Sequence, residues 1–312
     1  MLRRFLFASA LVSLAFAAAA VGAVSSGKVV RNGEIVFSSL QVRNGDYDLY
    51  LMRADGAGER RITRRRAFER YPKWSPDGKW LAYISNRSRP STETAYEIYV
   101  MRPNGTGFRR VTNDRWIDDQ LAWSPDGKRI AFESNRQTGK FALWVLNVDR
   151  SGLRKLADNA SVPAWSPDGE TIAFVRSNPK GGPSGTDEIW VMDQNGSNER
   201  RLTAPPVGRT SSGRDSMPEW SPDGNQIAFV RRYRGRSDIY TMHADGTGLR
   251  RLTKDSGQYS WPAWAQDGRR IAYVRHHSRK VDVNVMNADG TQQKRLTTGG
   301  LDYAYLDWQP LP

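Results

Sequence analysis

The chain has 312 residues, a formal net charge of +14, 28 glycines, 11 tryptophans and no cysteine. The lack of cysteine excludes disulfide staples, thiolate catalysis, thiolate metal sites and an acylated-cysteine anchor, so stability must come from packing. The length suits one large all-β domain or two ordinary domains. The positive charge favours an anionic partner or surface, unless arginine richness is a habit of the whole genome, and it does not indicate a fold.

Residues 1–23 have the pattern of an export signal. Arg3 and Arg4 form a basic start, no charge interrupts the stretch from Phe5 to Ala20, and small residues follow. We expect cleavage after Ala23 by the general secretory route, which places the mature protein in the periplasm or outside the cell. The alternative is a retained anchor, because the apolar run is nearly long enough to span a bilayer. Without the leader, no stable membrane anchor is expected.

One motif recurs along the remaining chain, residues 28–312. Trp-Ser-Pro-Asp-Gly begins at Trp74, Trp123, Trp165 and Trp220, and a variant begins at Trp264. Proline fixes φ at the second position of a turn, aspartate supports the turn, and glycine takes the position with positive φ. Each copy precedes an apolar strand of the Ile-Ala-Phe type, so the motif predicts a hairpin turn.

Two more strands complete the repeat. A strand such as Glu97-Ile-Tyr-Val-Met101 occurs in six copies, and each copy runs through a glycine turn into a short basic strand such as Arg109-Arg-Val-Thr112. With the strand that ends at the tryptophan, the unit has four strands, a to d. Successive tryptophans, through Trp308, lie 49, 42, 55, 44 and 44 residues apart. That period and the two apolar strand faces are typical of a β-propeller blade.

The ends of the chain predict how the ring closes. The first unit lacks a tryptophan strand, and Trp308 has no strands after it. Tyr303 to Trp308 therefore supply the missing innermost strand of the first blade, which removes an open sheet edge. The fold class expected is all-β, a six-bladed β-propeller of four-stranded antiparallel blades.

These motifs resemble the PD40 (WD40-like) repeats of the TolB family, and the resemblance covers nearly all of Val29 to Pro310. It implies a six-bladed propeller, exported to the periplasm or cell envelope, that works through protein contacts. In the family, the TolB propeller binds the peptidoglycan-associated lipoprotein, and a separate α/β domain precedes the propeller. Only Val24 to Lys28 separate the leader from the first blade here, so the resemblance carries over a fold and a binding function rather than that particular partner.

The b-to-c and d-to-a connections are expected on one face, and they vary in length, as in Ser85 to Tyr96 and Arg176 to Asp187. Variable loops on a rigid scaffold commonly bind partners, although harmless insertions are the alternative. Residues four or five positions before each tryptophan should surround the channel mouth on this face. We predict an envelope protein or peptide as partner, bound by ten residues: Glu69, Arg70, Asp118, Asp119, Arg214, Asp215, Arg232, Arg234, Tyr259 and Tyr303.

The paired basic residues of strand d are interpreted as protection of an outer sheet edge. The acid that begins strand c is expected to hold the preceding loop rather than a metal. An exported destination speaks against nucleic-acid binding.

No catalytic constellation is recognisable, so we expect a protein without enzymatic activity, cofactor or metal. The three histidines are His243, His276 and His277, and neither a Gly-x-Ser-x-Gly elbow nor a His-Glu-x-x-His motif occurs. Two alternatives remain: a glycan lyase that uses channel histidines and a metal, and a binder of anionic wall polymer. The lyase requires histidine, arginine and carboxylates to converge in the channel.

Overall fold

The computed structural model describes residues 33–40, 45–64, 66–88, 96–180, 185–208, 212–277, 280–297 and 302–310. The predicted leader, residues 1–23, lies outside these ranges. The described residues contain strands and turns, and no helix among them is long and apolar enough to cross a membrane.

Twenty-four strands make up the described fold, and their bounds fall where the repeat predicts them. The strands of the first half are β1 (Ile35–Leu40), β2 (Tyr47–Met52), β3 (Arg60–Arg61), β4 (Glu69–Trp74), β5 (Leu81–Ser85), β6 (Glu97–Met101), β7 (Arg109–Arg110), β8 (Asp118–Trp123), β9 (Arg129–Ser134), β10 (Ala142–Asn147), β11 (Arg154–Asp158) and β12 (Ala160–Trp165). Those of the second half are β13 (Thr171–Asn178), β14 (Thr186–Asp193), β15 (Arg200–Arg201), β16 (Arg214–Trp220), β17 (Gln226–Tyr233), β18 (Arg236–His243), β19 (Arg250–Arg251), β20 (Gln258–Trp264), β21 (Arg270–His277), β22 (Lys280–Asn287), β23 (Lys294–Arg295) and β24 (Asp302–Trp308).

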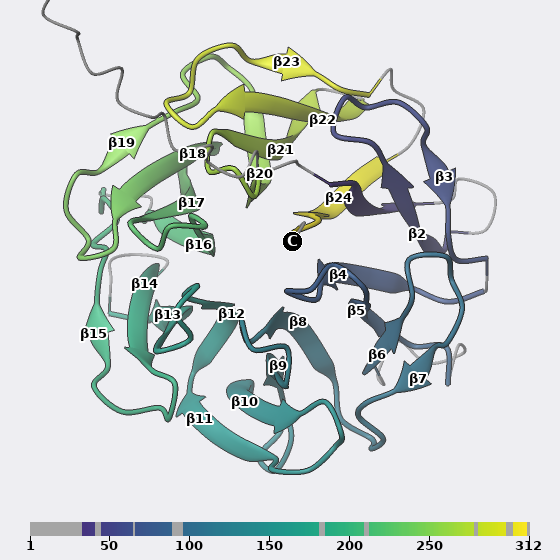
Figure 1. Cartoon of the computed structure of the whole chain (residues 1–312). Helices are drawn as coiled ribbons and strands as arrows, with labels where there is room; N and C mark the ends of the chain where they lie inside the picture. Colours follow the sequence, from purple (N-terminus) through teal and green to yellow (C-terminus); the bar gives the residue numbers. More distant parts are fainter. Residues whose placement is uncertain are drawn as a thin grey trace, which may run out of the picture.

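The strands form sheets that stand around a central axis, as in a β-propeller (Figure 1). Four sheets have four strands each: β24-β1-β2-β3, β4-β5-β6-β7, β8-β9-β10-β11 and β20-β21-β22-β23. The C-terminal strand β24 pairs antiparallel with β1, with Trp308 opposite Ile35, as the sequence predicts. A fifth sheet has eight strands, β12 to β19, and its two halves are joined by one parallel residue pair, Asp187 and Arg214.

The Trp-Ser-Pro-Asp-Gly motif forms the predicted turn between the first two strands of a sheet. In the first copy, the Asp77 carboxylate accepts hydrogen bonds from the Ser75 hydroxyl at 2.6 Å and the Lys79 amide at 3.1 Å. The Trp80 amide donates to Ser75 Oγ at 2.9 Å, and Gly78 has a φ of 66°. The turn is therefore held by its own side chains, and glycine supplies the left-handed conformation.

The core lies between neighbouring sheets rather than on one side of them. All five residues of β6 are buried, as are Ile130, Ala131 and Phe132 of β9. Side chains of β5 and β6 pack in one cluster with those of β8, β9 and β10. Both faces of a strand therefore need apolar residues, which explains the unbroken Ile-Tyr-Val-Met pattern.

The basic pairs of the short outer strands do more than protect an edge. The second member pairs with the acid that begins strand c: Arg110 contacts Glu97, and Arg251 lies 3.0 Å from Asp238. The first member donates to a turn carbonyl of the next sheet, as Arg109 does to Val148 at 2.8 Å. Further donations of this kind run from Arg154 to Asn195 and from Arg250 to Asp289, and Arg200 donates to Asp245 between the two halves of the eight-stranded sheet. These arginines join neighbouring sheets, and the strand-c acids hold strand d.

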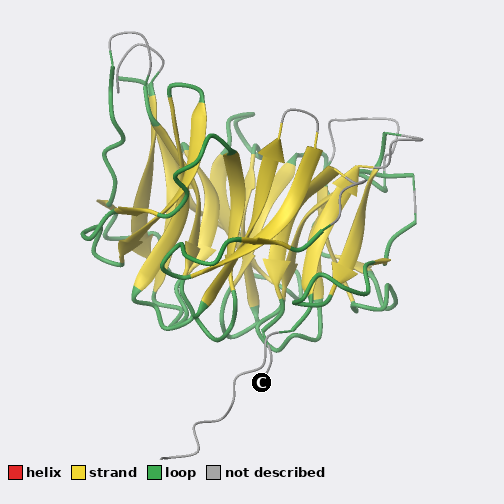
Figure 2. Cartoon of the chain, turned by 90° about the horizontal axis from the view of Figure 1, so that it is seen from above, coloured by secondary structure: helices red, strands yellow, loops and turns green. Residues whose placement is uncertain are grey.

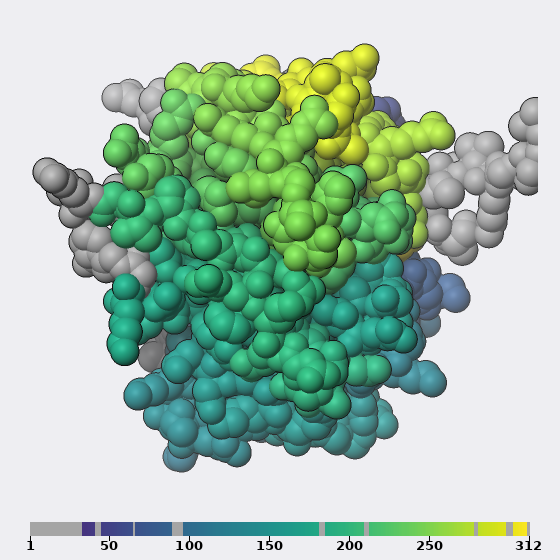
Figure 3. All heavy atoms as spheres, turned by 90° about the vertical axis from the view of Figure 1, so that its left-hand side faces the viewer, coloured from purple at the N-terminus to yellow at the C-terminus, as the bar shows by residue number. Residues whose placement is uncertain are grey.

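The two faces of the molecule differ (Figure 2). The short-turn face carries the turns that follow strands a and c, such as residues 75–80 and 102–108. The long-loop face carries the connections that follow strands b and d, including residues 233–236. The strands β13, β14, β17, β18, β21 and β22 have eight residues each, against five or six in β1, β2, β5, β6, β9 and β10. The teal and green residues of the eight-stranded sheet dominate the side view in Figure 3. The fold thus raises three hairpins above the rest of the long-loop face.

Candidate functional site

A bulge in each of the six strands that end at a tryptophan shapes the central channel. The residue three positions before each tryptophan has a positive φ, between 43° and 55°, although none is glycine. The pairing register shifts at the same place in each sheet. Bulges of this kind redirect side chains. The six residues, which all line the channel, are Tyr71, Gln120, Val162, Met217, Trp261 and Tyr305.

Three aromatic rings narrow the channel at this level. The centroids of Tyr71 and Tyr305 lie 4.2 Å apart, those of Trp261 and Tyr305 lie 4.5 Å apart, and those of Tyr71 and Trp261 lie 5.4 Å apart. The remaining cavity measures about 40 Å³, which is room for one or a few water molecules. The rings come from β4, β20 and β24, so three of the innermost strands each place one aromatic ring at the channel.

A charged cluster crosses the channel on the side of the short-turn face. Lys73 Nζ lies 3.1 Å from Glu219 Oε2 and 3.2 Å from Asp307 Oδ1. The other oxygen of Asp307 accepts the Trp74 amide at 2.8 Å. Burial alone would lower the pKa of Lys73, but the two carboxylates raise it overall, so the lysine stays charged. The cluster ties β4, β16 and β24 together across the axis.

A second polar group lies on the opposite side of the aromatic rings. Arg70 stands over the Tyr96 ring at 4.4 Å and faces Asp119, which pairs in register with Glu133 of β9. Burial raises the pKa of Asp119 to about 6, although Arg70 opposes the change. Burial and the Asp119 charge raise the pKa of Glu133 to about 8. Arg70 and Asp119 therefore lie near the channel as predicted, and they come together with a carboxylate that the sequence did not single out.

Three predicted acids need correction, because they are buried rather than displayed at the channel mouth. Glu69, Asp118 and Asp215 are each 0% exposed. Each pairs with an arginine near the end of strand b or just after it: Arg87 contacts Glu69, Arg136 lies 2.6 Å from Asp118, and Arg231 binds both oxygens of Asp215 at 2.7 Å.

The arginines of these pairs also pack against aromatic rings. Arg136 lies 4.9 Å from the Phe132 ring and 5.4 Å from the Trp144 ring. Burial raises the pKa of Asp118 to about 6 even though Arg136 lowers it. A buried carboxylate needs such a partner, so these arginines hold the acids in the interior.

The two predicted tyrosines occupy equivalent interior positions. Tyr259 and Tyr303 are 1% and 3% exposed. Tyr259 donates its hydroxyl to Asp255, and the Tyr303 hydroxyl lies 3.0 Å from Glu59. Their rings are buried, so the prediction that they lie open at the mouth is corrected too.

The predicted arginines of the tall hairpins do lie at the surface. Arg214, Arg232 and Arg234 are exposed. Arg214 pairs with Asp187 at 2.9 Å, and Arg234 stands over the Tyr233 ring at 5.2 Å. Arg214 and Arg232 are direct cross-strand neighbours on β16 and β17.

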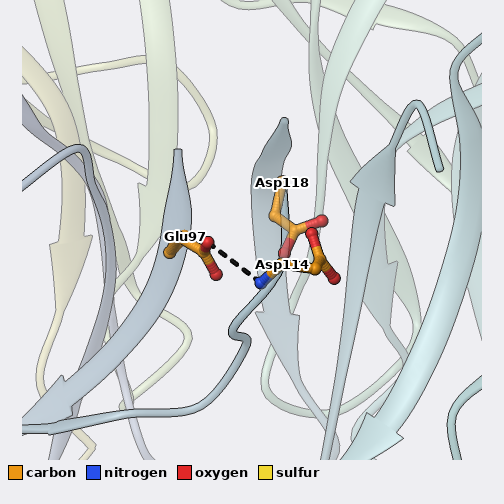
Figure 4. A group of neighbouring side chains, drawn as sticks. All are labelled: Glu97, Asp114 and Asp118. Carbon is orange, nitrogen blue, oxygen red and sulfur yellow. Dashed lines mark hydrogen bonds between the residues drawn. The ribbon is translucent and has the colours of Figure 1, made fainter. Parts of the chain in front are cut away.

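Three carboxylates meet between β6 and β8: Glu97, Asp114 and Asp118 (Figure 4). Their oxygens lie within 4.8 Å of one another, a number and spacing that a cation could use. Arginines already neutralise them. Arg136 lies 3.3 Å from Asp114 and 2.6 Å from Asp118, and Arg110 contacts Glu97. The Glu97 carboxylate also accepts the Asp114 amide at 3.1 Å. We therefore interpret the three carboxylates and their arginines as a structural group between two neighbouring sheets rather than as a cation site.

The histidines lie away from the narrow part of the channel. His276 contacts the Ser260 hydroxyl at 2.8 Å at the edge of the long-loop face, and His277 lies 3.7 Å from Asp282. His243 ends β18 on the short-turn face. None of the three lines the channel cavity, in the part of the chain that the structure describes. The charged residues that line this cavity are Lys73 and Glu219.

Sequence reasoning missed Lys73, Glu219, Asp307 and Glu133. The first three stand directly before a tryptophan, where the other copies have alanine. Glu133 stands where four other copies of strand b have valine or isoleucine and the first copy has Ser38. The signal was present as a departure from the repeat in each case.

Comparison with known proteins agrees with this geometry. The family model described as the TolB beta propeller domain matches residues 89–181 and 150–305. An uncharacterised protein of Agrobacterium fabrum is 30% identical over 203 residues, which are 63% of this chain and 51% of that protein. The chain thus spans about half the length of this relative.

Solved structures also resemble the fold. TolB from Acinetobacter baumannii superposes with a TM-score of 0.74 at 20% identity, over 89% of this chain and 67% of that chain. A putative TolB from Agrobacterium tumefaciens gives a TM-score of 0.66 at 22% identity, over 90% of this chain and 100% of that chain. The repeated motifs, the propeller fold and the family match together show that this chain belongs to the TolB beta-propeller family.

Proposed function

We propose that the chain is an exported, six-bladed TolB-like propeller that acts as a non-catalytic scaffold and binds an envelope protein through its long-loop face. The count of six treats the eight-stranded sheet as two blades, because a single residue pair joins its halves. The pairing of β24 with β1 supports a closed ring. Export to the periplasm or cell surface rests on the pattern of residues 1–23 and on the resemblance to TolB proteins.

One observation carries the proposal: two exposed arginines lie directly opposite each other near the tip of a tall hairpin. Arg214 of β16 and Arg232 of β17 are cross-strand partners, and like charges in that arrangement are destabilising. Asp187 compensates Arg214 at 2.9 Å, and no ion pair is found for Arg232 or Arg234 among the described residues. An acidic partner surface would relieve this repulsion.

The buried acids strengthen the inference. Glu69, Asp118 and Asp215 were expected to give the face a mixed charge, but their pairs with arginine remove them from its surface. The remaining exposed charge of the hairpins is basic, including Arg236 and Lys280. Exposed arginine beside an aromatic ring, as at Arg234 and Tyr233, is a common composition of interface hot spots. We therefore propose a partner with an acidic surface.

The lyase alternative finds less support. It needs histidine in the channel, and the channel cavity is lined by Lys73 and Glu219 but by no histidine among the described residues. Three aromatic rings also narrow the channel through which a substrate would have to pass. A binder of anionic wall polymer would use the same exposed arginines, and the experiment below distinguishes it.

The test is a pull-down from envelope extract with the mature chain, residues 24–312, followed by identification of the captured protein. The variant is Arg232→Ser with Arg234→Ser. Arg231 stays, because its pair with buried Asp215 makes it structural. The matched control is Lys128→Ser with Arg269→Ser, which removes the same charge from exposed turns of the short-turn face.

We expect one discrete protein to be captured by the mature chain and the control, to be lost with the hairpin variant, and to dissociate as salt rises. Equal capture by the hairpin variant would refute the assignment of the face. If purified wall polymer or oligosaccharide binds instead, or is cleaved, the protein-scaffold proposal fails.

A further inference from the structure

The short-turn face contains an arginine–tryptophan contact that recurs at two places between neighbouring sheets. The second residue after the glycine of the Trp-Ser-Pro-Asp-Gly motif is Arg129 in one copy and Arg270 in another. Arg129 stands over the ring of Trp165, the tryptophan of the next sheet, at 4.8 Å, and Arg270 stands over Trp308 at 5.4 Å. Both tryptophans are buried. At these two junctions between neighbouring sheets, which we call seams, a guanidinium group covers the face of an indole.

The seam between β4–β7 and β8–β11, which lie side by side (Figure 1), has tryptophan in that position. Trp80 stacks with Arg102 of its own sheet at 5.1 Å. Trp123 of the next sheet is partly exposed, unlike Trp165 and Trp308. No arginine is found over the Trp123 ring among the described residues. The place that a guanidinium occupies over Trp165 and Trp308 is therefore open over Trp123.

A slot of about 480 Å³ occupies this place. Trp80 and Trp123 line it, with Val100 and Val148 beside them. The Trp123 indole is held in place, since its Nε1 donates to the Lys73 carbonyl at 3.2 Å. A preformed slot with aromatic walls and a few polar groups is typical of a binding site for a small group.

The charges at the slot match those around Arg129 in the seam where Arg129 covers Trp165, which we call the completed seam. Asp126 lies 3.7 Å from the guanidinium of Arg129. Asp77 holds the same turn position beside the slot, and its ion-pair partner is the exposed Lys79 at 3.8 Å. Arg109 also lines the slot, as its counterpart Arg154 lies close to Arg129. The completed seam therefore already accommodates a second guanidinium in this position.

We propose that this slot binds an arginine side chain of a partner, with the guanidinium stacked on Trp123 and paired with Asp77. The site lies on the face opposite the basic hairpins. The molecule would therefore bind an acidic surface on one face and a basic side chain on the other. Cation–π stacking on tryptophan and a planar ion pair both favour arginine over lysine. A partner that presents one arginine in an extended segment would fit.

The test uses N-acetyl-arginine amide as the probe and the indole N–H signals of the full mature chain in NMR spectra as the readout. Trp80→Arg supplies the guanidinium from the chain itself, and it also assigns the Trp80 signal by its loss. We expect the probe to shift the Trp80 and Trp123 signals saturably in the millimolar range. N-acetyl-lysine amide and the uncharged N-acetyl-citrulline amide should bind at least about tenfold more weakly.

Two variants test the contacts separately. Asp77→Asn should weaken probe binding several-fold, whereas Asp168→Asn, at the same turn position of a different sheet, should not change it. Trp80→Arg should abolish binding and raise the melting temperature. The proposal is overturned if lysine or citrulline amide binds as well as arginine amide, if Trp80→Arg folds and still binds, or if the two aspartate variants behave alike.

Discussion

Glu133 allows a quantitative test of how the sheets are held together. It occupies a position in β9 that valine fills in β13 and β17, as Val175 and Val230. Its Oε2 is buried and has no hydrogen-bond partner in the described part of the chain. Burial and the nearby Asp119 charge raise its pKa to about 8, against a smaller opposing effect of the Val162 amide. Above about pH 4.5 the Glu133 carboxyl is ionised in the unfolded chain, where its pKa is ordinary. In the folded chain it must either keep its proton or be ionised while buried, so in both cases it destabilises the fold.

The sign follows from the direction of the pKa change. The folded state binds the Glu133 proton more tightly than the unfolded state, whose ordinary value is 4.5. The stability associated with this proton is fully present below about pH 4.5, and it is lost as pH rises toward about 8. The full change corresponds to roughly 5 kcal/mol, at about 1.4 kcal/mol per pKa unit. Because the side chain is partly exposed, we expect about 2 to 3 kcal/mol after solvent screening.

Glu133→Gln isolates the charge, and Glu133→Val also restores the apolar contact of the other sheets. Urea unfolding, followed by tryptophan fluorescence, should show a gain of about 2 to 3 kcal/mol for the glutamine variant near pH 8.5. That gain should vanish near pH 4.5, while part of the valine gain persists. Glu170→Gln, in an exposed turn, is the control and should change little at either pH. A glutamine gain that does not depend on pH would refute the reasoning.

Three further perturbations test other parts of the fold. Lys73→Met leaves Glu219 and Asp307 facing each other, so the free energy of unfolding in urea at pH 7 should fall by about 3 to 5 kcal/mol, and adding Glu219→Gln should recover part of it. Arg136→Met leaves Asp118 buried without its main partner and should cost about 3 to 5 kcal/mol by the same assay, whereas Arg154→Ala, which removes hydrogen bonds at an exposed edge, should cost about 1 kcal/mol. Gly56→Ala places a Cβ 2.4 Å from the Leu296 carbonyl, so it should lower the melting temperature more than Gly139→Ala, which has the same sign of φ and open space around it; equal losses would show that the clash is relieved elsewhere.

The sequence predicted the strands well because their causes are local. The Trp-Ser-Pro-Asp-Gly turn is held by hydrogen bonds within six residues, from Ser75 to Trp80, so its recurrence fixes where strands a and b meet. The pairing of β24 with β1 followed from counting the half-repeats. The bulge at Tyr71 and its equivalents could not be predicted in this way, because glycine, the usual sign of a positive φ, is absent from these positions.

The candidate site was predicted less well because its residues depend on partners from other strands. Asp118 stands at the expected end of strand a, but Arg136, which follows strand b, makes it an interior residue. The repeat does contain a signal for this pairing. Glu69 and Asp118 each come with an arginine just after strand b, Arg87 and Arg136, and Asp215 comes with Arg231 near the end of strand b. An acid that recurs together with a distant arginine indicates a buried pair, whereas Arg232 and Arg234 have no such companion in the repeat.

The length of the hairpins gives a last reason to place partner binding on the long-loop face. β9 and β10 complete a sheet with six residues each, so the inter-sheet core does not require the eight residues of β17 and β18. The additional residues hold Arg232, Tyr233 and Arg234 away from the core, with Arg232 beside the like charge of Arg214. Stability alone does not favour such an arrangement, since repulsion and exposed aromatic surface both oppose it. The arrangement is favourable once an acidic surface covers it, and this is the condition that the pull-down with Arg232→Ser and Arg234→Ser examines.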